Sequence, residues 1–371
     1  MTPKTWENVK FSDIASFKYG KMPTKNKILE TGGYPIYSGY RYVGYYNEYN
    51  IDKNTLIIIA RGVGGTGDVK LTKEKCYLTN LSIAVFPFNN NSVNTLYLYY
   101  YFLLHNLRYL DSGSAQSQIT ISDLEKLVIK LPPLETQKKI AVVLSSLDDK
   151  IELNNKINQN LEQQADLLFN DLFLEDKDCI KLSEVISTTS GGTPSRKNLN
   201  FYTNGSFCWV KSKELNGTFI TETEEKINQL AIEKSSAKLL PPYSVLLAMY
   251  GATVGEYAII SKQMTCNQAI CAIIPNEKYP YTYIYEYIKL SKERIKTLAI
   301  GSAQQNISQV LIKDLLVHKN INKIKEYHFK TRYLFELIKN NQIENEKLKQ
   351  LRDTLLPKLL SGEIDVDKVE V

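Results

Sequence analysis

The sequence contains two copies of one unit, and this duplication limits the possible folds more than any other feature. Three pairs of short segments recur in the same order: VKFSDI (9–14) with IKLSEV (180–185), LTNLSI (78–83) with TCNQAI (265–270), and GSAQSQI (113–119) with GSAQQNI (301–307). The matching segments lie about 171 to 188 residues apart, and the middle pair aligns Asn80 with Asn267. Such a repeat predicts two similar domains of ordinary size.

Each copy ends in a segment whose seam residues recur at alternating spacings of three and four, as in a heptad repeat. In the first copy these residues are Ile140, Leu144, Leu147, Ile151, Asn154, Asn158, Leu161, Ala165, Leu168 and Leu172. The second copy, 187 residues later, has Thr331, Leu334, Ile338, Asn341, Asn345, Leu348, Arg352, Leu355 and Leu359. The pattern predicts two long helices, each with two asparagines in an otherwise largely apolar seam.

An asparagine in such a seam lowers stability but fixes the register, because its amide needs a partner. If the two helices pair antiparallel about a pseudo-two-fold axis, Asn154 faces Asn345 and Asn158 faces Asn341. The alternative is that each helix packs only on its own domain and exposes its asparagines. At roughly 35 to 40 residues, each helix would be about 55 Å long, which suits a spacer between two domains.

The segment TLIIIARGVGGTG (55–67) raises the possibility of a phosphate-binding loop, since Gly62, Gly64 and Gly67 match G-x-G-x-x-G. The second copy, SVLLAMYGATVGEYA (244–258), does not keep that spacing, and a strand-like segment follows in both copies, whereas a phosphate loop must open a helix. We therefore expect a turn between two strands and no cofactor.

Composition excludes several other classes of protein. The five cysteines are scattered without a C-x-x-C pair, which argues against a disulfide framework and a zinc site. No apolar stretch is long enough to span a bilayer, and we expect a cytoplasmic protein. We find no methyltransferase, Walker A or nuclease motif, so no catalytic residue is predicted. The net charge of +6 is uneven, because residues 1–130 are basic and residues 131–175 are acidic.

Basic and aromatic residues together suit a nucleic acid, although a stretch such as YPIYSGYRYVGYYNEY (34–49) also fits half-buried strands. The turns GKMPTKNK (20–27) and GGTPSRKN (191–198) occupy corresponding places in the two copies and present donors that could reach phosphates or guanine edges. The first candidates for DNA contacts are Lys21, Lys25, Ser195, Arg196 and Lys197, followed by Arg41, Arg61, Lys211 and Lys213, and by Gln116 and Gln304 as amides that could pair with adenine. The alternative for each turn is a solvated polar loop.

Four segments give the chain a family resemblance: PPLETQKKIAVVLSSLDDKIELNNKINQNLEQQADLLFNDLF (132–173), TTSGGTPSRKN (188–198), YPIYSGYRYVGYYNEY (34–49) and LRDTLLPKLLSGEI (351–364). With these segments the chain resembles the specificity (S) subunit of type I restriction-modification systems, over essentially its whole length. The resemblance implies an α+β protein with two mixed α/β target-recognition domains, separated by two long antiparallel coiled-coil helices, and an internal pseudo-two-fold repeat. We expect the first recognition domain at 1–132, the central helix at 133–178, the second domain at 179–320 and the distal helix at 321–371.

The resemblance also implies a function without catalysis. Each domain would read one half of a bipartite double-stranded DNA target, and the complex would include two modification (methyltransferase) subunits and, through them, restriction subunits. In the family the conserved helices receive the modification subunits, and we expect the acidic side chains of the first helix to face outward for this purpose: Glu135, Asp148, Asp149, Glu152, Glu162 and Asp166. The second helix departs from the pattern, because VHKNINKIKEYHF (317–329) replaces the Leu-Pro-Pro-Leu-Glu entry at 131–135. A stand-alone DNA-binding or scaffold protein, or an S-adenosylmethionine-dependent methyltransferase, are the alternatives.

Overall fold

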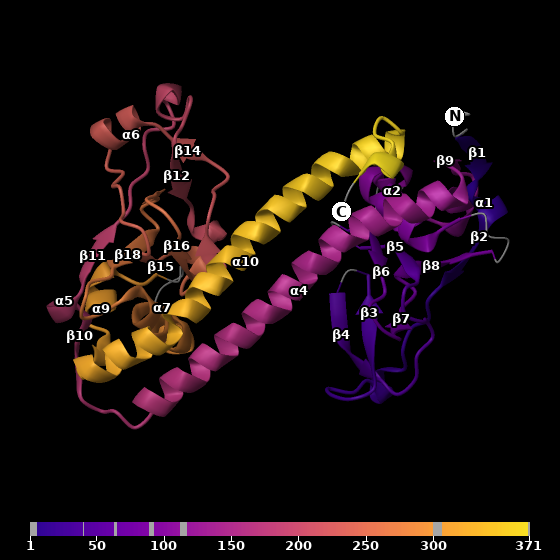
Figure 1. The fold of residues 1–371 in the computed structure, drawn as a ribbon. Coiled ribbons are helices and arrows are strands. Elements are labelled where there is room, and N and C mark those ends of the chain that lie inside the picture. Colours follow the sequence, from indigo (N-terminus) through magenta and orange to yellow (C-terminus); the bar gives the residue numbers. More distant parts are fainter. Residues whose placement is uncertain are drawn as a thin grey trace. The chain divides into compact units, whose positions relative to one another are not determined.

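The computed structural model describes residues 6–39, 41–62, 65–88, 93–111, 117–299 and 306–369. The chain forms two compact units, of which unit 1 consists of residues 1–150 and 348–371 and unit 2 of residues 151–347. The two long helices, α4 (Leu134–Phe173) and α10 (Ile321–Ser361), each contribute to both units (Figure 1). Among the described residues, every helix is too short or too polar to span a lipid bilayer.

Unit 1 is built from short strands and helices before α4. In chain order these are β1 (Glu7–Lys10), α1 (Phe11–Ile14), β2 (Ala15–Tyr19), β3 (Tyr34–Ser38), β4 (Arg41–Tyr46), β5 (Leu56–Ile59), β6 (Val69–Leu71), β7 (Tyr77–Leu78), β8 (Ser82–Pro87), α2 (Thr95–Leu104), α3 (Ile121–Glu125) and β9 (Val128–Leu131). The strands form an antiparallel sheet in the order β2-β8-β5-β6, a smaller sheet β4-β3-β7 and the ribbon β1-β9. The fully apolar strand LIII of β5 is buried along its whole length, as expected for a central strand covered on both faces.

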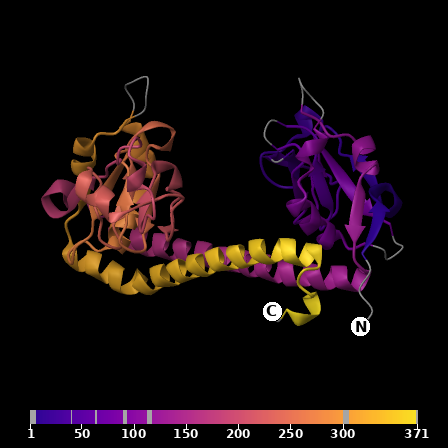
Figure 2. The same cartoon turned by 90° about the horizontal axis from the view of Figure 1, so that it is seen from above.

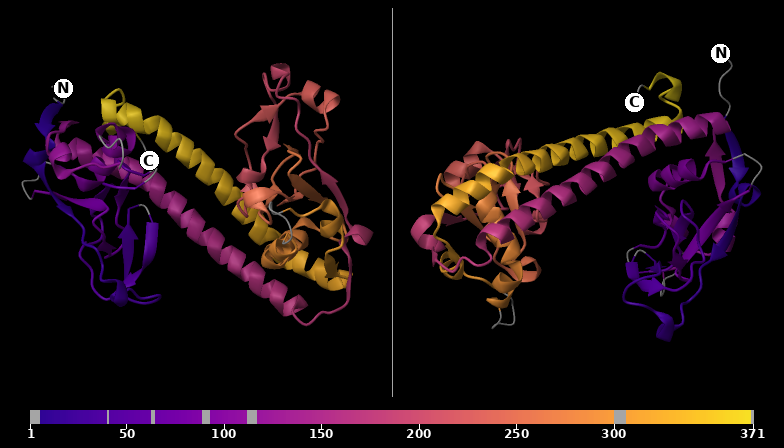
Figure 3. Two further views of the ribbon diagram at one scale, coloured as in Figure 1. Left: turned by 180° about the vertical axis from the view of Figure 1, so that it is seen from behind. Right: turned by 60° about the horizontal axis from the view of Figure 1, so that its bottom comes forward.

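Unit 2 repeats this plan. Its elements are β10 (Cys179–Lys181), α5 (Leu182–Val185), β11 (Ser187–Ser190), β12 (Phe207–Val210), β13 (Phe219–Ile220), β14 (Lys226–Ile227), α6 (Gln229–Lys234), β15 (Val245–Ala248), β16 (Tyr257–Ile260), β17 (Thr265–Cys266), β18 (Ile270–Ile274), α7 (Tyr281–Leu290), α8 (Lys292–Thr297), α9 (Gln309–Lys313) and β19 (Leu316–His318). The sheets follow the orders β11-β18-β15-β16-β13, β14-β12-β17 and β10-β19, so that β13 is an added strand relative to unit 1. Figure 3 shows the ribbon from two further sides, with the strands and short helices of unit 2 coloured from magenta to orange. The structure thus confirms the two similar α+β domains predicted from the repeat.

Strand pairing corrects one of the sequence matches by one residue. The amide of Ser82 donates to the carbonyl oxygen of Thr79, and the amide of Ile270 donates in the same way to Asn267 (both 3.2 Å). Thr79 is therefore the structural counterpart of Asn267, and the alignment of Asn80 with Asn267 is wrong. The chance identity of two asparagines one position out of register misled the comparison of sequences.

The glycine-rich segment after β5 is a turn between strands. Strand β5 pairs antiparallel with β6, and β15 pairs antiparallel with β16 in the same way, so in both copies the segment leads into a strand and not into an α-helix. The second copy contains only the short 3-10 helix η5 (Gly251–Thr253). Gly67 has a φ of 90°, and a Cβ at that position would lie 2.6 Å from the backbone nitrogen of Arg108. Glycine is required there by backbone conformation and by close approach, as expected for a turn.

The two long helices begin in the same way despite their different sequences. Only residues 132–133 separate β9 from α4, and only residues 319–320 separate β19 from α10. In the first link the Gln137 side chain donates to the carbonyl oxygen of Pro132 (2.9 Å), whereas in the second the Asn320 side chain accepts from the amide of Lys323 (3.2 Å). The unusual entry of the second helix therefore changes the side-chain hydrogen bonds at the start of the helix but keeps the length of the link.

Each long helix packs on both units. Ile140, Ala141 and Leu144 of α4 lie in the core of unit 1 together with Leu356 and Leu359 of α10. The core of unit 2 contains Leu161, Ala165, Phe169 and Phe173 of α4 and Ile324, Tyr327, Phe335 and Ile338 of α10. The two helices lie side by side within each unit (Figure 2).

Candidate nucleic-acid interface

The two turns singled out in the sequence occupy the same place in both units. Gly20 and Gly191 each lie at the end of an outer strand, beside the carbonyl oxygens of Leu78 and Cys266 respectively. A Cβ at Gly20 would lie 2.2 Å from the Leu78 oxygen, and a Cβ at Gly191 would lie 2.2 Å from the Cys266 oxygen. Only glycine allows this contact, so the same local packing positions the residues that follow in each copy.

The side chains proposed in these two turns are all exposed: Lys21 and Lys25 in unit 1, and Ser195, Arg196 and Lys197 in unit 2. Lys25 begins a short 3-10 helix, η1 (Lys25–Lys27). Neither Lys21 nor Lys25 forms an ion pair with any described carboxylate. Such exposure is required for a DNA contact and is equally compatible with a solvated loop.

Arg196 is held by three residues that the sequence analysis did not identify. Its Nη1 donates to Oε2 of Glu225 (2.5 Å), and its Cζ lies 4.5 Å from the ring centroid of Tyr202 and 5.0 Å from that of Trp209. A guanidinium beside a carboxylate and against aromatic faces is stabilised by both contacts. Nothing in the spacing of these residues predicts the contact, since Glu225 is 29 positions away in sequence.

Two further basic candidates of unit 2, Lys211 and Lys213, belong to the same network. Nζ of Lys211 donates to Oε1 of Glu225 (2.5 Å) and to Oε2 of Glu224 (3.3 Å), and Lys213 pairs with Glu224 (2.7 Å). The Lys211 side chain is only 16% exposed, compared with 59% for Lys213. Hydrogen bonds from Arg196 and Lys211 lower the pKa of Glu225 to about 2, so this carboxylate is ionised at neutral pH.

The two arginines of unit 1 among the candidates, Arg41 and Arg61, differ in their surroundings. Arg41 lies on β4 opposite Ser38 and is exposed. Arg61 forms an isolated β-bridge with Gln118, and its Nε is buried without a hydrogen-bond partner among the described residues. Arg61 thus lies where the chain returns from the GSAQ segment.

Gln116 and Gln304 lie outside the described residues, so their positions cannot be compared with the prediction. The ends of their segments are described. Arg61 pairs with Gln118 in unit 1, and Tyr250 pairs with Asn306 in unit 2. Both GSAQ segments therefore return to the end of a corresponding central strand.

The four seam asparagines form the contacts that the sequence suggested. Nδ2 of Asn154 donates to Oδ1 of Asn345 (2.9 Å), and Nδ2 of Asn341 donates to Oδ1 of Asn158 (2.8 Å). Asn345 in turn donates to Asn155 (2.9 Å). Partner numbers fall along α10 as they rise along α4, so the helices are antiparallel, and the alternative with exposed asparagines is wrong for Asn154, Asn158 and Asn345, which are buried.

The packing of helix α2 against α4 and α10 in unit 1 includes a polar network. The hydroxyl of Tyr100 donates to Oδ2 of Asp148 (2.7 Å), and Nη1 of Arg352 donates to Oδ1 of the same carboxylate (2.6 Å). This network satisfies a partly buried charge with two donors, one from each side. In unit 2 the repeat replaces Tyr100 of α2 by Glu286 of α7. It likewise replaces Asp148 of α4 by Phe335 of α10, and Arg352 of α10 by Ala165 of α4.

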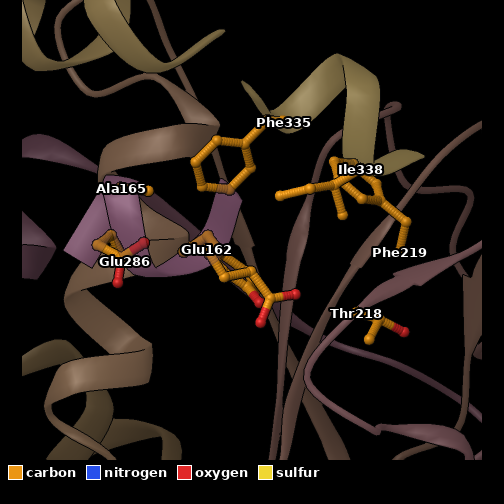
Figure 4. Close-up of a pocket in the computed structure, with 8 residues that line it drawn as sticks. Glu162, Ala165, Thr218, Phe219, Glu286, Phe335 and Ile338 are labelled. Carbon is orange, nitrogen blue, oxygen red and sulfur yellow. The ribbon is translucent and has the colours of Figure 1, made fainter. Parts of the chain in front are cut away.

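In unit 2 these replacements leave a small cavity of about 10 Å³ (Figure 4). Glu162, Ala165, Glu286 and Phe335 line it, together with side chains of β13, α7 and α10. A volume of that size can hold one water molecule. Burial raises the pKa of Glu286 to about 8, an effect that the neighbouring Asp166 increases and Lys289 opposes.

The acidic residues of α4 do not form one outward face, which corrects the expectation from the sequence. Asp148 binds Tyr100 and Arg352, Asp166 pairs with Lys289 of α7, and Glu162 is half-buried beside the cavity. Glu135 and Asp149 are exposed. The heptad pattern describes only one stripe of the helix, and nothing in the sequence indicates that a second stripe packs against α2 and α7. Among the described residues, no group of three His, Cys, Asp or Glu side chains could hold a metal ion.

Comparison with known proteins agrees with this geometry. The family described as "Type I restriction modification DNA specificity domain" matches the chain twice, at residues 3–163 and 175–353. The HindI specificity subunit of Haemophilus influenzae is 27% identical over 329 residues, covering 67% of this chain and 71% of the relative. The MjaIX specificity subunit of Methanocaldococcus jannaschii is 26% identical over an alignment of 415 residues, which covers 99% of this chain and 95% of the relative. The crystal structure of an S subunit from M. genitalium has the same fold, with a TM-score of 0.71, 18% identity and 97% of each chain covered.

Proposed function

This chain belongs to the type I restriction-modification DNA specificity family and recognises DNA sequence for such a system, and from that premise we propose that each unit reads one half of a bipartite target. The observation that carries the proposal is the double repeat: the family match, the order of strands and the glycine-anchored turn all occur twice. Two similar readers in one chain suit two half-sites in one duplex, as two subunits do in symmetric dimers.

The helices α4 and α10 would act as the spacer that sets the distance between the half-sites. Their pairing is specific, because the Asn154–Asn345 and Asn158–Asn341 hydrogen bonds form only in one register. A shift of one helical turn would separate these amides and leave buried donors without partners. The spacer between the half-sites would therefore have a fixed length.

The chain itself would contribute no catalytic group. In this proposal two modification subunits dock on the helices and transfer methyl groups, and restriction subunits join through them. Exposed apolar and acidic side chains on α4, such as Val142 and Asp149, offer surface for such docking. Lys21, Lys25 and Lys197 would contact phosphates or base edges in the two halves of the target.

The test is to co-express the chain with a modification subunit of its system in a host without DNA methylation and to map methylated bases across the genome. The proposal expects a motif of two short specific halves with a constant nonspecific spacer. A continuous motif without a spacer would contradict it. Methylation by the chain alone would favour a methyltransferase, and the absence of any complex with the modification subunit would favour a stand-alone DNA-binding protein.

A further inference from the structure

Corresponding basic residues of the two units have different surroundings. The turns beginning at Gly20 and Gly191 align Lys25 with Arg196, since both lie five positions after the matching glycine. In unit 1 no described carboxylate pairs with Lys25. In unit 2, Arg196 is bound by Glu225 and lies against two aromatic rings.

The registers of the small sheets show that unit 1 has no equivalent of these contacts. Strand β3 pairs with β7 as β12 pairs with β17, which makes Ile36 the counterpart of Trp209. The neighbouring pairs of β3 with β4 and of β12 with β14 then make Gly44 the counterpart of Glu225. A glycine and an aliphatic residue thus occupy the positions where unit 2 has a carboxylate and an indole.

The backbone of the turn in unit 2 is fixed by the same rings. The indole Nε1 of Trp209 donates to the carbonyl oxygen of Gly192 (3.0 Å), and the hydroxyl of Tyr202 donates to that of Pro194 (2.6 Å). Trp209 is 3% exposed, whereas the Arg196 side chain is 53% exposed. An accessible guanidinium is therefore mounted on a rigid base.

The contact with Glu225 leaves one edge of Arg196 available. Glu225 accepts from Nη1, while Nε and Nη2, which lie along another edge of the planar guanidinium, make no hydrogen bond to any described residue. Two parallel donors on one edge match O6 and N7 of guanine in the major groove. Lysine at the corresponding place in unit 1 is a flexible point charge without this geometry.

We propose that Glu225 is a specificity-determining residue of unit 2, because it positions Arg196 for bidentate contact with a guanine. This inference rests on the proposed function, in which unit 2 reads one half-site. Arg196 loses less conformational entropy on binding when Glu225, Tyr202 and Trp209 already hold it. The adjacent negative charge also weakens the attraction of Arg196 for phosphate, while its hydrogen bonds to a neutral base are retained, so the pair favours sequence reading over nonspecific binding.

The test uses the full chain in complex with its modification subunits and measures binding to duplexes that differ at single base pairs. Glu225→Gln is expected to reduce the preference for guanine at one base pair by roughly two- to tenfold. Arg196→Ala and Arg196→Lys are expected to reduce it about ten- to a hundredfold at the same base pair. Binding to unrelated DNA and its dependence on salt are expected to stay close to those of the wild type for Arg196→Lys. Both are expected to increase for Glu225→Gln, because the loss of the negative charge strengthens the attraction of Arg196 for phosphate.

Glu224→Gln is the matched control, because Glu224 carries the same charge in the same network and does not contact Arg196. It is expected to leave the preference for guanine unchanged. Three results would overturn the inference: an unchanged preference in all Arg196 and Glu225 variants, a loss of affinity for every sequence alike in Arg196→Ala, or an equal effect of Glu224→Gln. If the wild-type complex shows a bipartite target and these results appear, only this inference fails. A wild-type complex without a bipartite target would instead contradict the proposed function and this inference with it.

Discussion

Replacement of Glu286 by glutamine should remove a pH-dependent loss of stability from unit 2. Glu286 is completely buried between α7 and the two long helices, where burial raises its pKa from the ordinary 4.5 to about 8. A carboxyl whose pKa is raised in the folded state holds its proton more tightly when folded. Its contribution to stability is therefore fully present below about pH 4.5 and is lost as the pH rises through about 8.

The shift from 4.5 to about 8 corresponds to at most about 5 kcal/mol between the neutral and the ionised form. The groups that face Glu286 are Asp166 and Glu162 of α4, Lys289 of α7 and the hydroxyl of Tyr327 in α10. Only Lys289 carries a positive charge, and it is shared with Asp166. We therefore expect the free energy of unfolding of Glu286→Gln, relative to that of the wild type, to rise by about 3 to 5 kcal/mol from pH 5 to pH 9.

The assay is urea unfolding of the full chain at pH 5 and pH 9, followed by tryptophan fluorescence in a Trp6→Phe background. The remaining Trp209 is buried in unit 2 and reports its unfolding. Glu336→Gln is the matched control: burial raises the pKa of Glu336, but hydrogen bonds from Lys339 and Tyr243 outweigh this and lower it below the ordinary 4.5. The stability that Glu336 provides is lost only as the pH falls below about 4.5, so the difference between Glu336→Gln and the wild type should be nearly the same at pH 5 and pH 9. A difference between Glu286→Gln and wild type that is the same at both pH values would refute the reasoning.

Two further substitutions test the packing of unit 2. Asn345→Leu should destabilise unit 2 by about 2 to 3 kcal/mol, because it leaves the buried amide of Asn154 without one partner. The double variant with Asn154→Leu should be destabilised by less than the sum of the two single variants. Strict additivity of the free energies of unfolding, measured in denaturant, would contradict the pairing. Gly191→Ala should cost about 3 kcal/mol by overpacking, since the new Cβ would meet the backbone oxygen of Cys266 at 2.2 Å. An unchanged midpoint of thermal unfolding for Gly191→Ala would contradict this, because it would show that the backbone at Gly191 can move away from Cys266 without loss of stability.

Periodicity and duplication carried the prediction of the fold. The seam asparagines could be placed because a heptad pattern fixes which side chains share a helix face, and the repeat then fixed which pairs meet. The resemblance supplied the arrangement of two recognition domains and two helices. The alignment of Asn80 with Asn267 failed because strand registers are set by hydrogen bonding and not by residue identity.

The contacts around the candidate DNA-binding residues could not be predicted in this way. Arg196 meets Glu225 through the pairing of β12 with β14, and two-residue strands such as β14 leave no periodic signal in the sequence. The replacement of Tyr100 by Glu286 at matching positions was likewise invisible, because it becomes meaningful only when the partners on α4 and α10 are known. The partly buried contacts of Asp148 and Asp166 could not be predicted for the same reason, because their partners lie on other elements.

The measurement that tests the account most directly is an exchange of one recognition domain. Residues 1–132 would be replaced by the corresponding domain of a relative with a known and different target, and the methylated motif would be mapped with the same modification subunit. The account predicts that one half of the motif changes to that of the relative, while the other half and the spacer length stay the same. A motif that changes in both halves, or in neither, would contradict the claim that each unit reads its own half of the target.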